Sequence, residues 1–174
     1  MLSNILIVRL FYFCYTFHNS QYFRRKDMYC KTATTKDISS LCILLQQLFS
    51  QESEFIPDSK LQTIALKKII ENESIGNVFI ILKEEKIVGM VNMLYTISTA
   101  LGGKVAILED MVLDEHYRGQ NLGTQLIQFA LFTAKENGCK RVTLLTDDDN
   151  IKAHKFYENQ GFHRFSMLPF KRLI

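Results

Sequence analysis

Residues 108–123 form the segment whose residue types and spacing most clearly favour chemistry. The sequence there, LEDMVLDEHYRGQNLG, is typical of an apolar strand that ends in a glycine-bearing turn and opens an amphipathic helix. The N–H groups at the start of a helix have no intrahelical acceptor, and they lie at the positive end of the helix dipole. The segment therefore predicts a binding site for a phosphate or pyrophosphate group.

The turn lacks the residues of two common nucleotide-binding sites. Residues 118–124, RGQNLGT, have neither the Lys-Ser/Thr pair of a P-loop nor the three spaced glycines of a dinucleotide fold. The following strand ends at Asp147–Asp149 and leads directly into another helix, so it supplies no ribose-binding carboxylate in the usual context. Both differences argue against nucleoside triphosphate and dinucleotide chemistry.

Residues that could bind a metal ion are scattered along the chain. The four cysteines and four histidines form no pair with metal-ligand spacing, and we expect the cysteines to be reduced, mostly buried thiols. Asp147–Asp149 has neither the glycine nor the distant glutamate of a calcium loop. We therefore predict no metal site. The three aspartates are expected to favour the N-terminus of the next helix and to attract a cationic amine.

Hydrophobic periodicity predicts the elements that must position the turn. Apolar residues at helical spacing predict four helices, and alternating or β-branched runs bounded by turns predict six strands. The expected helices are Thr35–Phe49, with Thr35 or Asp37 as its cap, Ser59–Asn72, Asn121–Asn137 and Asn150–Asn159. The expected strands are Tyr29–Thr34, Asn77–Leu82, Lys86–Thr96, Lys104–Leu113, Arg141–Thr146 and a final strand that begins at Phe162.

Length and composition favour one compact domain over residues 28–174. A chain of 174 residues that is 47% hydrophobic can bury a single sizeable core. The formal net charge of +3 comes from residues 1–27, and basic and acidic residues balance beyond them. Strong nucleic-acid binding usually needs a basic face, so we expect no nucleic-acid partner.

Residues 1–27 are interpreted as an extension that precedes this domain. Residues 1–18 are apolar and aromatic, but Arg9 interrupts them and the positive charges lie mainly after them. The run is also short for a bilayer span, and no small-residue cleavage site follows it. We interpret the extension as non-essential and consistent with a translation start placed too far upstream, with a weak membrane anchor as the alternative. A cytoplasmic location is expected, and the oligomeric state is open, a homodimer included.

Two motifs resemble the GNAT superfamily of N-acetyltransferases, and the resemblance covers Leu108–Phe162. LEDMVLDEHYRGQNLGTQLI resembles the family's acetyl-CoA-binding strand, pyrophosphate loop and helix, and DDDNIKAHKFYENQGF resembles the helix that follows. The family loop has Arg or Gln, two residues, Gly, one residue, then Gly or Ala. Arg118 and Gly123 match this pattern, whereas Asn121 stands at the first Gly position. Asn tolerates a left-handed backbone better than most residues.

The resemblance implies the GNAT fold, which is an α/β (α+β) single domain. Its central sheet is mixed and mostly antiparallel, with about four flanking helices. By this resemblance, strands 104–113 and 141–146 are parallel neighbours that splay apart. The splay would admit acetyl-CoA as the cosubstrate.

The resemblance also implies which residues bind acetyl-CoA. Backbone groups of Met111, Val112 and Leu113 would hold the pantetheine arm as they would hold an added strand. Backbone N–H groups of the loop would hold the pyrophosphate, and the loop residues are Arg118, Gly119, Gln120, Asn121, Leu122, Gly123 and Thr124. Asn150 would bond pantetheine or cap its own helix, and both alternatives stay open.

Acetyl transfer to an amine requires a base and benefits from an acid. The substrate ammonium, with a pKa of roughly 10, must lose a proton, and the departing thiolate, at roughly 8 to 9, gains one. Glu109 resembles the family's base, and adjacent Asp110 would lie on the opposite face of a regular strand. Tyr157 matches the tyrosine that the family commonly uses to protonate the coenzyme A sulfur. A backbone N–H near Met111 or Val112 would polarise the thioester carbonyl.

Each of these side chains also has a purely structural alternative. Glu109 could serve as a charge partner or cap, and Tyr157 could simply pack. The expected function is direct transfer of acetyl from acetyl-CoA to a primary amine of a small molecule in a ternary complex. The alternatives are a non-catalytic acyl-CoA-binding or sensor module, and an acetyltransferase of protein N-termini or aminoacyl-tRNA. No specificity motif for the acceptor is recognisable in residues 35–72 or in the C-terminal strand, where acceptor contacts are expected.

Overall fold

The computed structural model describes residues 24–25, 27–51 and 56–174. Most of the predicted extension, residues 1–23 and 26, lies outside the described residues, so its boundary with the domain stays a prediction. The chain forms two compact units, which divide between Leu144 and Leu145. Each unit is described by itself below.

Among the described residues, six strands of the first unit form one mixed sheet. Its strand order is β1-β2-β3-β4-β5-β6, and every neighbouring pair is antiparallel except β5 and β6, which are parallel. The strands are β1 (Arg24–Arg25), β2 (Met28–Thr32), β3 (Gly76–Lys83), β4 (Lys86–Ser98), β5 (Gly103–Leu113) and β6 (Val142–Leu144). The predicted sheet, with its one parallel pair, is therefore confirmed.

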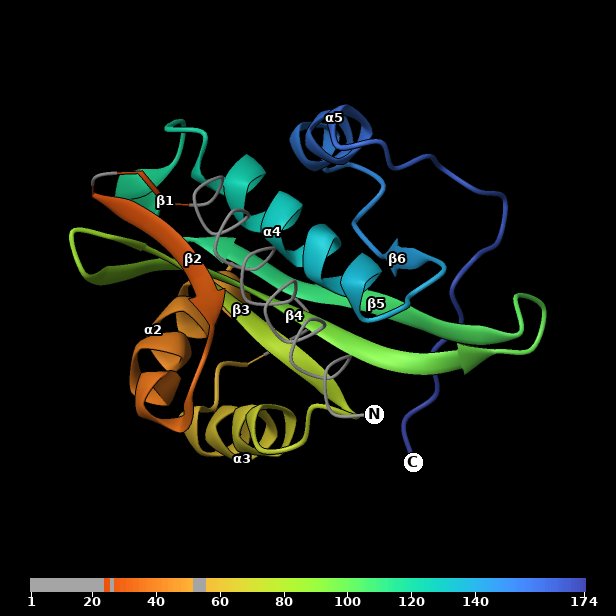
Figure 1. The fold of residues 1–174 in the computed structure, drawn as a ribbon, viewed down its shortest axis with the longest axis horizontal. Helices are drawn as coiled ribbons and strands as arrows, with labels where there is room; N and C mark the ends of the chain where they lie inside the picture. The colour runs from red at the N-terminus through yellow and green to blue at the C-terminus, as the bar shows by residue number, and fades with distance from the viewer. Residues whose placement is uncertain (1–23, 26, 52–55) are drawn as a thin grey trace, which may run out of the picture. The chain divides into compact units, whose positions relative to one another are not determined.

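Helices cover both faces of this sheet. Helices α2 (Ile38–Phe49) and α3 (Ser59–Ile70) lie on one face, and α4 (Leu122–Glu136) lies on the other (Figure 1). Two short 3-10 turns, η1 (Thr35–Asp37) and η2 (Glu115–Tyr117), precede α2 and α4 respectively. No helix in the described part of the chain is long and apolar enough to cross a membrane.

Alternating side chains of the central strands explain this layering. One face of β3 and β4 packs against α2 and α3 in a core that includes Leu41, Leu45, Leu66, Val78, Ile80 and Met90. On the opposite face, the Phe79 ring meets the Phe129 ring of α4 edge-on, with 5.5 Å between centroids. A fully buried side chain of this size contributes about 1.5–3 kcal/mol. Burial of both faces therefore holds β3 and β4 in place, and β5 pairs with β4.

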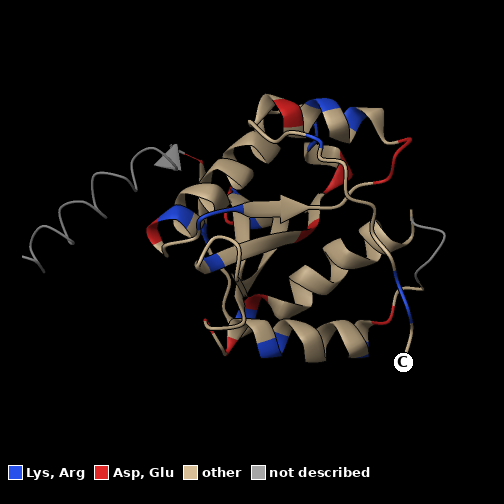
Figure 2. Ribbon diagram, turned by 90° about the vertical axis from the view of Figure 1, so that its right-hand side faces the viewer, with Lys and Arg blue, Asp and Glu red and all other residues tan. Residues whose placement is uncertain are grey.

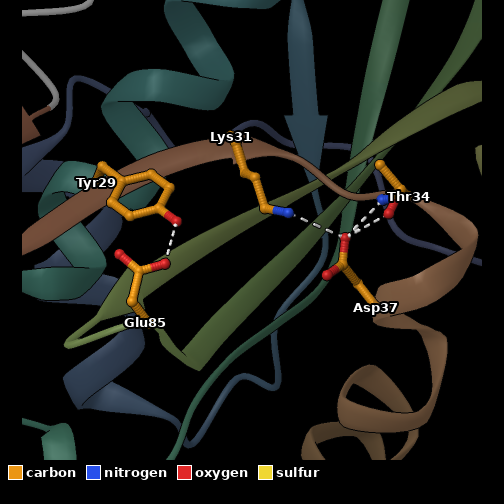
Figure 3. A network of polar contacts seen from close by, with 5 residues as sticks. All are labelled: Tyr29, Lys31, Thr34, Asp37 and Glu85. Atoms are coloured by element: carbon orange, nitrogen blue, oxygen red, sulfur yellow. Dashed lines mark hydrogen bonds and ion pairs between the residues drawn. The ribbon is translucent and has the colours of Figure 1, made fainter.

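Asp37, and not Thr35, is the residue immediately before α2, but its side chain bonds back to Thr34 and does not cap the helix. Asp37 Oδ2 accepts hydrogen bonds from the Thr34 N–H at 2.8 Å and the Thr34 hydroxyl at 2.9 Å, and Lys31 Nζ lies 3.3 Å away (Figure 3). Burial alone would raise the pKa of Asp37, but the hydrogen bonds from Thr34 and Lys31 outweigh it and lower the pKa below its ordinary value. The charged carboxylate therefore ties β2 to the first turn before α2.

The β3–β4 hairpin turns through two residues in an unfavourable conformation. Glu84 and Glu85 have φ values of 50° and 62°, and Lys83 pairs with Lys86 across the turn. Turns of this kind favour Asn and Gly, because a left-handed backbone is strained for most residues. Glu85 gains a compensating contact, since its Oε2 accepts a hydrogen bond from the Tyr29 hydroxyl at 3.0 Å (Figure 3).

Replacing Glu84 by asparagine is expected to raise the free energy of unfolding by about 1 kcal/mol. The Glu84 side chain is exposed, and Asn adopts the left-handed conformation at lower cost. Glu85→Asn is the matched control, because it forfeits the Tyr29 hydrogen bond and should gain less. Urea unfolding measures both variants, and a Glu84→Asn protein no more stable than wild type contradicts the prediction.

The second unit contains α5 (Ile151–Asn159) followed by residues 160–174. The predicted final strand from Phe162 is wrong, because residues 162–174 form no strand. The chain instead turns back on α5: the Phe162 N–H donates to the Tyr157 carbonyl at 3.1 Å, and the Arg164 guanidinium contacts the His154 ring and lies 3.8 Å from the Asp148 carboxylate. These local contacts take the place of strand pairing.

Candidate active site

A β-bulge interrupts β5 immediately after Glu109. Glu109 pairs with Asn92 of β4, and the next register pair in this direction joins Val112 to Met90, so β5 holds one extra residue. Asp110 lies within the bulge and has a φ of 50°. A left-handed aspartate costs free energy, so its neighbours must hold it in place.

The bulge brings two carboxylates to the same face of the sheet. Residues directly opposite one another in antiparallel strands share a face, so Glu109 lies on the face of Asn92 and of Val78, which is the α2–α3 face. Asn92 Nδ2 donates a hydrogen bond to Asp110 Oδ2 at 2.6 Å, so the Asp110 carboxylate lies there too. The expectation that Asp110 points to the opposite face is therefore wrong, because the strand is not regular.

Beyond the parallel pairing, β5 has an open edge. The β5–β6 ladder joins Ala106–Leu108 to Val142–Leu144, and no described residue continues it along Met111–Leu113. On the other side, Val112 and Leu113 remain paired with β4. No strand of the described structure thus pairs with the outer side of Met111–Leu113, although the Leu113 carbonyl accepts a hydrogen bond from Arg118 Nε. An unpaired edge of this kind suits the amides of an added, strand-like ligand.

The loop before α4 contains two residues with a left-handed backbone, and one of them is not a glycine. Asn121 is the residue before the helix and is left-handed, with φ 62° and ψ 15°, as is Gly119, with φ 74°. The Asn121 side chain does not cap the helix, and the first intrahelical hydrogen bond runs from the Gln125 N–H to the Asn121 carbonyl at 3.3 Å. The N–H groups of Leu122, Gly123 and Thr124 are therefore free of intrahelical acceptors and can meet an anion.

Basic side chains lie beside this loop. Lys83 Nζ donates to Gln120 Oε1 at 2.6 Å, and Lys86 Nζ lies 5.1 Å from the centre of the Tyr117 ring. Arg118 Nε donates to the Leu113 carbonyl at 3.2 Å, which fixes the loop to the end of β5. The Lys83 ammonium therefore adds to the helix dipole at a predicted phosphate site, whereas Lys86 is ion-paired with Asp114 at 3.5 Å.

The second unit carries the other two predicted residues. The Asn150 side chain accepts a hydrogen bond from the Ala153 N–H at 3.1 Å, so the capping alternative is observed, and a pantetheine contact stays a prediction. The Tyr157 ring packs edge-on against the rings of Phe156 and Phe162, at 5.2 and 5.8 Å between centroids. Burial raises the pKa of Tyr157 above its ordinary value, so the phenol stays a proton donor at neutral pH.

The first unit thus brings together Glu109, the open edge of β5 and the 118–124 loop, whereas Asn150 and Tyr157 belong to the second unit. Two residues of the first-unit site were missed from the sequence. Lys83 gave no local signal, but Asn92 did, as a polar residue within the apolar run of β4. The described residues contain no cluster of three or more His, Cys, Asp or Glu side chains that could hold a metal ion.

Comparison with known proteins agrees with this arrangement. The sequence profile of the acetyltransferase (GNAT) family matches residues 42–162, which is more than half of the chain. The chain belongs to the GNAT acetyltransferase family. The family uses acetyl-CoA as its cosubstrate, and the free N–H groups before α4 and the open β5 edge suit a pyrophosphate carrying an amide-bearing arm.

Relatives of this GNAT protein are N-acetyltransferases by name. It is 31% identical to the uncharacterized N-acetyltransferase YhfO of Bacillus subtilis over 78% of this chain and 89% of that protein. It is 34% identical to N-alpha-acetyltransferase 30 of Schizosaccharomyces pombe over 52% of this chain and 59% of that protein. It is also 34% identical to glucosamine 6-phosphate N-acetyltransferase of Arabidopsis thaliana over 37% of this chain and 42% of that protein. The matches to the last two therefore span about half of those relatives.

The fold of this GNAT protein is also that of solved structures. A possible acetyltransferase from Clostridium difficile 630 superposes with a TM-score of 0.77 over 86% of this chain and 99% of that chain, at 15% sequence identity. At that identity the likeness supports the fold alone. The mixed α/β fold predicted from the sequence is confirmed.

Proposed function

We propose that the protein transfers the acetyl group of acetyl-CoA directly to a primary amine of a small molecule in a ternary complex. The proposal rests on three features that follow one another along the chain. They are the exposed Glu109 carboxylate, the edge of β5 at Met111–Leu113 that no strand pairs with, and the loop 118–124, which leads into a helix without a side-chain cap. A strand edge and a helix N-terminus in sequence suit the amides and the pyrophosphate of one extended ligand.

The proposed chemistry uses a base for the attacking amine and an acid for the departing thiolate. Glu109 accepts a proton from the substrate ammonium, directly or through a water, and the amine nitrogen then attacks the thioester carbonyl carbon. A backbone N–H at Met111 or Val112 stabilises the charge that develops on the carbonyl oxygen. The carbon–sulfur bond breaks, and Tyr157 gives its proton to the sulfur. The nitrogen loses its second proton as the amide forms, and this proton passes through solvent to the Tyr157 phenolate, while the proton on Glu109 is released to solvent. The role of Tyr157 rests on the motif and on its raised pKa.

Two alternatives to this proposal are an acetyltransferase that acts on a polypeptide amine and a non-catalytic protein that binds acyl-CoA. The names of the relatives include a glucosamine 6-phosphate N-acetyltransferase and an N-alpha-acetyltransferase, so a small amine and a polypeptide amine both belong in the test. Lys/Arg and Asp/Glu segments both occur along the described ribbon (Figure 2). The balance of basic and acidic residues beyond residue 27 makes a nucleic acid the less favoured partner. A non-catalytic acyl-CoA-binding module is the second alternative.

Thiol release from acetyl-CoA across a panel of amines tests the proposal. The panel includes glucosamine 6-phosphate, other amino sugars, polyamines and short peptides with free N-termini. Amine-dependent thiol release is expected with at least one small amine. Binding of acetyl-CoA without turnover on any amine would support the binding module, and turnover on peptides alone would support a protein acetyltransferase.

Replacing Tyr157 by phenylalanine is expected to lower kcat about tenfold, which is below the usual contribution of a general acid, because a thiolate leaves readily without protonation. The phenyl ring keeps the packing against Phe156 and Phe162. Burial raises the pKa of Tyr157, so ionisation of its phenol should not lower wild-type kcat at any pH below about 10. A decrease in kcat that phenol ionisation causes at higher pH should be absent in the variant. Profiles of kcat against pH measure both effects, and identical profiles would show that Tyr157 only packs.

A further inference from the structure

Asn92 is a buried amide on the sheet face that carries Glu109. Its side chain belongs to a residue only 4% exposed, in the middle of the apolar strand β4. Nδ2 donates to Asp110 Oδ2 at 2.6 Å. Oδ1 is excluded from solvent and has no hydrogen-bond partner in the described structure. The amide nitrogen therefore bonds Asp110 in the bulge, whereas the amide oxygen has no hydrogen bond.

The carboxylate of Asp110 fixes which way the amide faces. Rotating the amide by half a turn would place Oδ1 against Asp110 Oδ2, and two acceptors repel one another. A buried carbonyl oxygen without a partner costs folding free energy, and an apolar side chain would avoid that cost. Its neighbour across the β3 pairing, Val78, is apolar. The hydrogen bond to Asp110 explains the amide nitrogen, but it leaves the buried oxygen as an acceptor that a ligand N–H could satisfy.

Asn92 and Glu109 are direct neighbours across the β4–β5 pairing, on the same face of the sheet. Side chains directly opposite one another across antiparallel strands have Cβ atoms about 4.5–5.5 Å apart. The Asn92 amide oxygen and the Glu109 carboxylate can therefore both approach one nitrogen at hydrogen-bond distance. Because Oδ1 is shielded from solvent, side chains that cover it must change rotamer for a ligand to reach it, which is fast for small displacements.

We propose that Asn92 Oδ1 and the Glu109 carboxylate together bind the N–H groups of the acceptor's amino group. This rests on the proposed function and specifies how its acceptor is recognised. A primary ammonium has three N–H donors, so it can bond both oxygens at once. A nitrogen with one or no N–H cannot, so the pair selects primary amines. Glu109 takes the proton, whereas Asn92 positions the nitrogen.

Replacing Asn92 by leucine, which has a similar shape, is expected to lower kcat/KM for the amine about tenfold through loss of a hydrogen bond to a charged group. The dissociation constant of acetyl-CoA should stay within about twofold, since Asp110 keeps further contacts. Asn77→Leu is the matched control on the opposite face, and its amine kinetics should equal those of wild type. An equal loss of amine and acetyl-CoA binding in Asn92→Leu, or no loss, would overturn the proposal.

A binding measurement decides the pairing even if no amine in the panel is acetylated. In the coenzyme A complex, methylammonium should shift the NMR signals of the Asn92 side-chain amide, which are identified by their absence in Asn92→Leu. Tetramethylammonium has the same charge but no N–H and should leave them in place. Equal shifts with both cations would show attraction by the carboxylates alone, and no shift with either would show that the amide binds no amine. Either result overturns the proposal, whereas a methylammonium-specific shift without turnover would contradict the proposed function alone.

Discussion

Replacing Glu109 by glutamine is expected to lower kcat by about a hundredfold, the lower end of the contribution of a general base. Glutamine has nearly the same shape but cannot accept the proton that a substrate ammonium must lose. The Glu109 side chain is exposed, so the fold and the affinity for acetyl-CoA should be preserved. Steady-state kinetics with a saturating amine, together with calorimetric binding of coenzyme A, measure the two quantities separately.

The control for this variant is Glu136→Gln, which removes an equal charge from the exposed end of α4. Its kcat should match that of wild type. If Glu109→Gln retains full activity, a different group accepts the proton, and Asp110 is the carboxylate to replace next because the bulge places it on the same face. If Glu109→Gln loses coenzyme A affinity in proportion to kcat, the side chain serves the fold and not the proton transfer.

Replacing Asn121 by valine is expected to weaken binding of acetyl-CoA about thirtyfold, which corresponds to about 2 kcal/mol. Asn121 has φ 62° immediately before α4, and a β-branched residue strongly disfavours that conformation. A valine there should pull the loop toward a right-handed or extended backbone and turn the N–H groups of residues 122–124 away from the phosphates.

Asn121→Gly is the matched control, because glycine adopts the left-handed conformation without strain. Its affinity for coenzyme A should equal that of wild type or exceed it. Calorimetric titration with coenzyme A compares the three proteins, and circular dichroism shows whether α4 persists in each. A valine variant that binds coenzyme A as tightly as the glycine variant would show that the conformation of Asn121 does not shape the phosphate site.

Local sequence was sufficient to predict the parts of the site that local chemistry determines. The turn at residues 118–124 and the start of α4 follow from the glycines and the apolar periodicity of one short segment, whereas the left-handed backbone of Asn121 was compatible with the sequence but not predicted by it. The cap of α5 by Asn150 was one of two alternatives that the sequence left open, and the structure shows it. Each depends on backbone preferences within a few residues, which are readable from sequence.

The rest depended on pairing between distant segments. The bulge at Asp110 reflects the pairing of β5 with β4 with one extra residue in β5, and the Asp110 carboxylate accepts a hydrogen bond from Asn92, far away in sequence. No alternation within residues 104–113 reveals that register, so Asp110 was assigned to the wrong face. The strand expected from Phe162 failed for a related reason. Its apolar residues allow a strand, but Arg164 and Phe162 make contacts back to α5 instead.

The central claim is that one acetyl group passes from acetyl-CoA to an amine for each coenzyme A released. Incubation with acetyl-CoA carrying an isotopically labelled acetyl group, followed by mass spectrometry of the amine and the protein, tests this most directly. We predict labelled N-acetyl amine and coenzyme A in equal amounts, with no label on the protein before the amine is added. Label retained on the protein, or coenzyme A released without labelled amine, would contradict direct transfer.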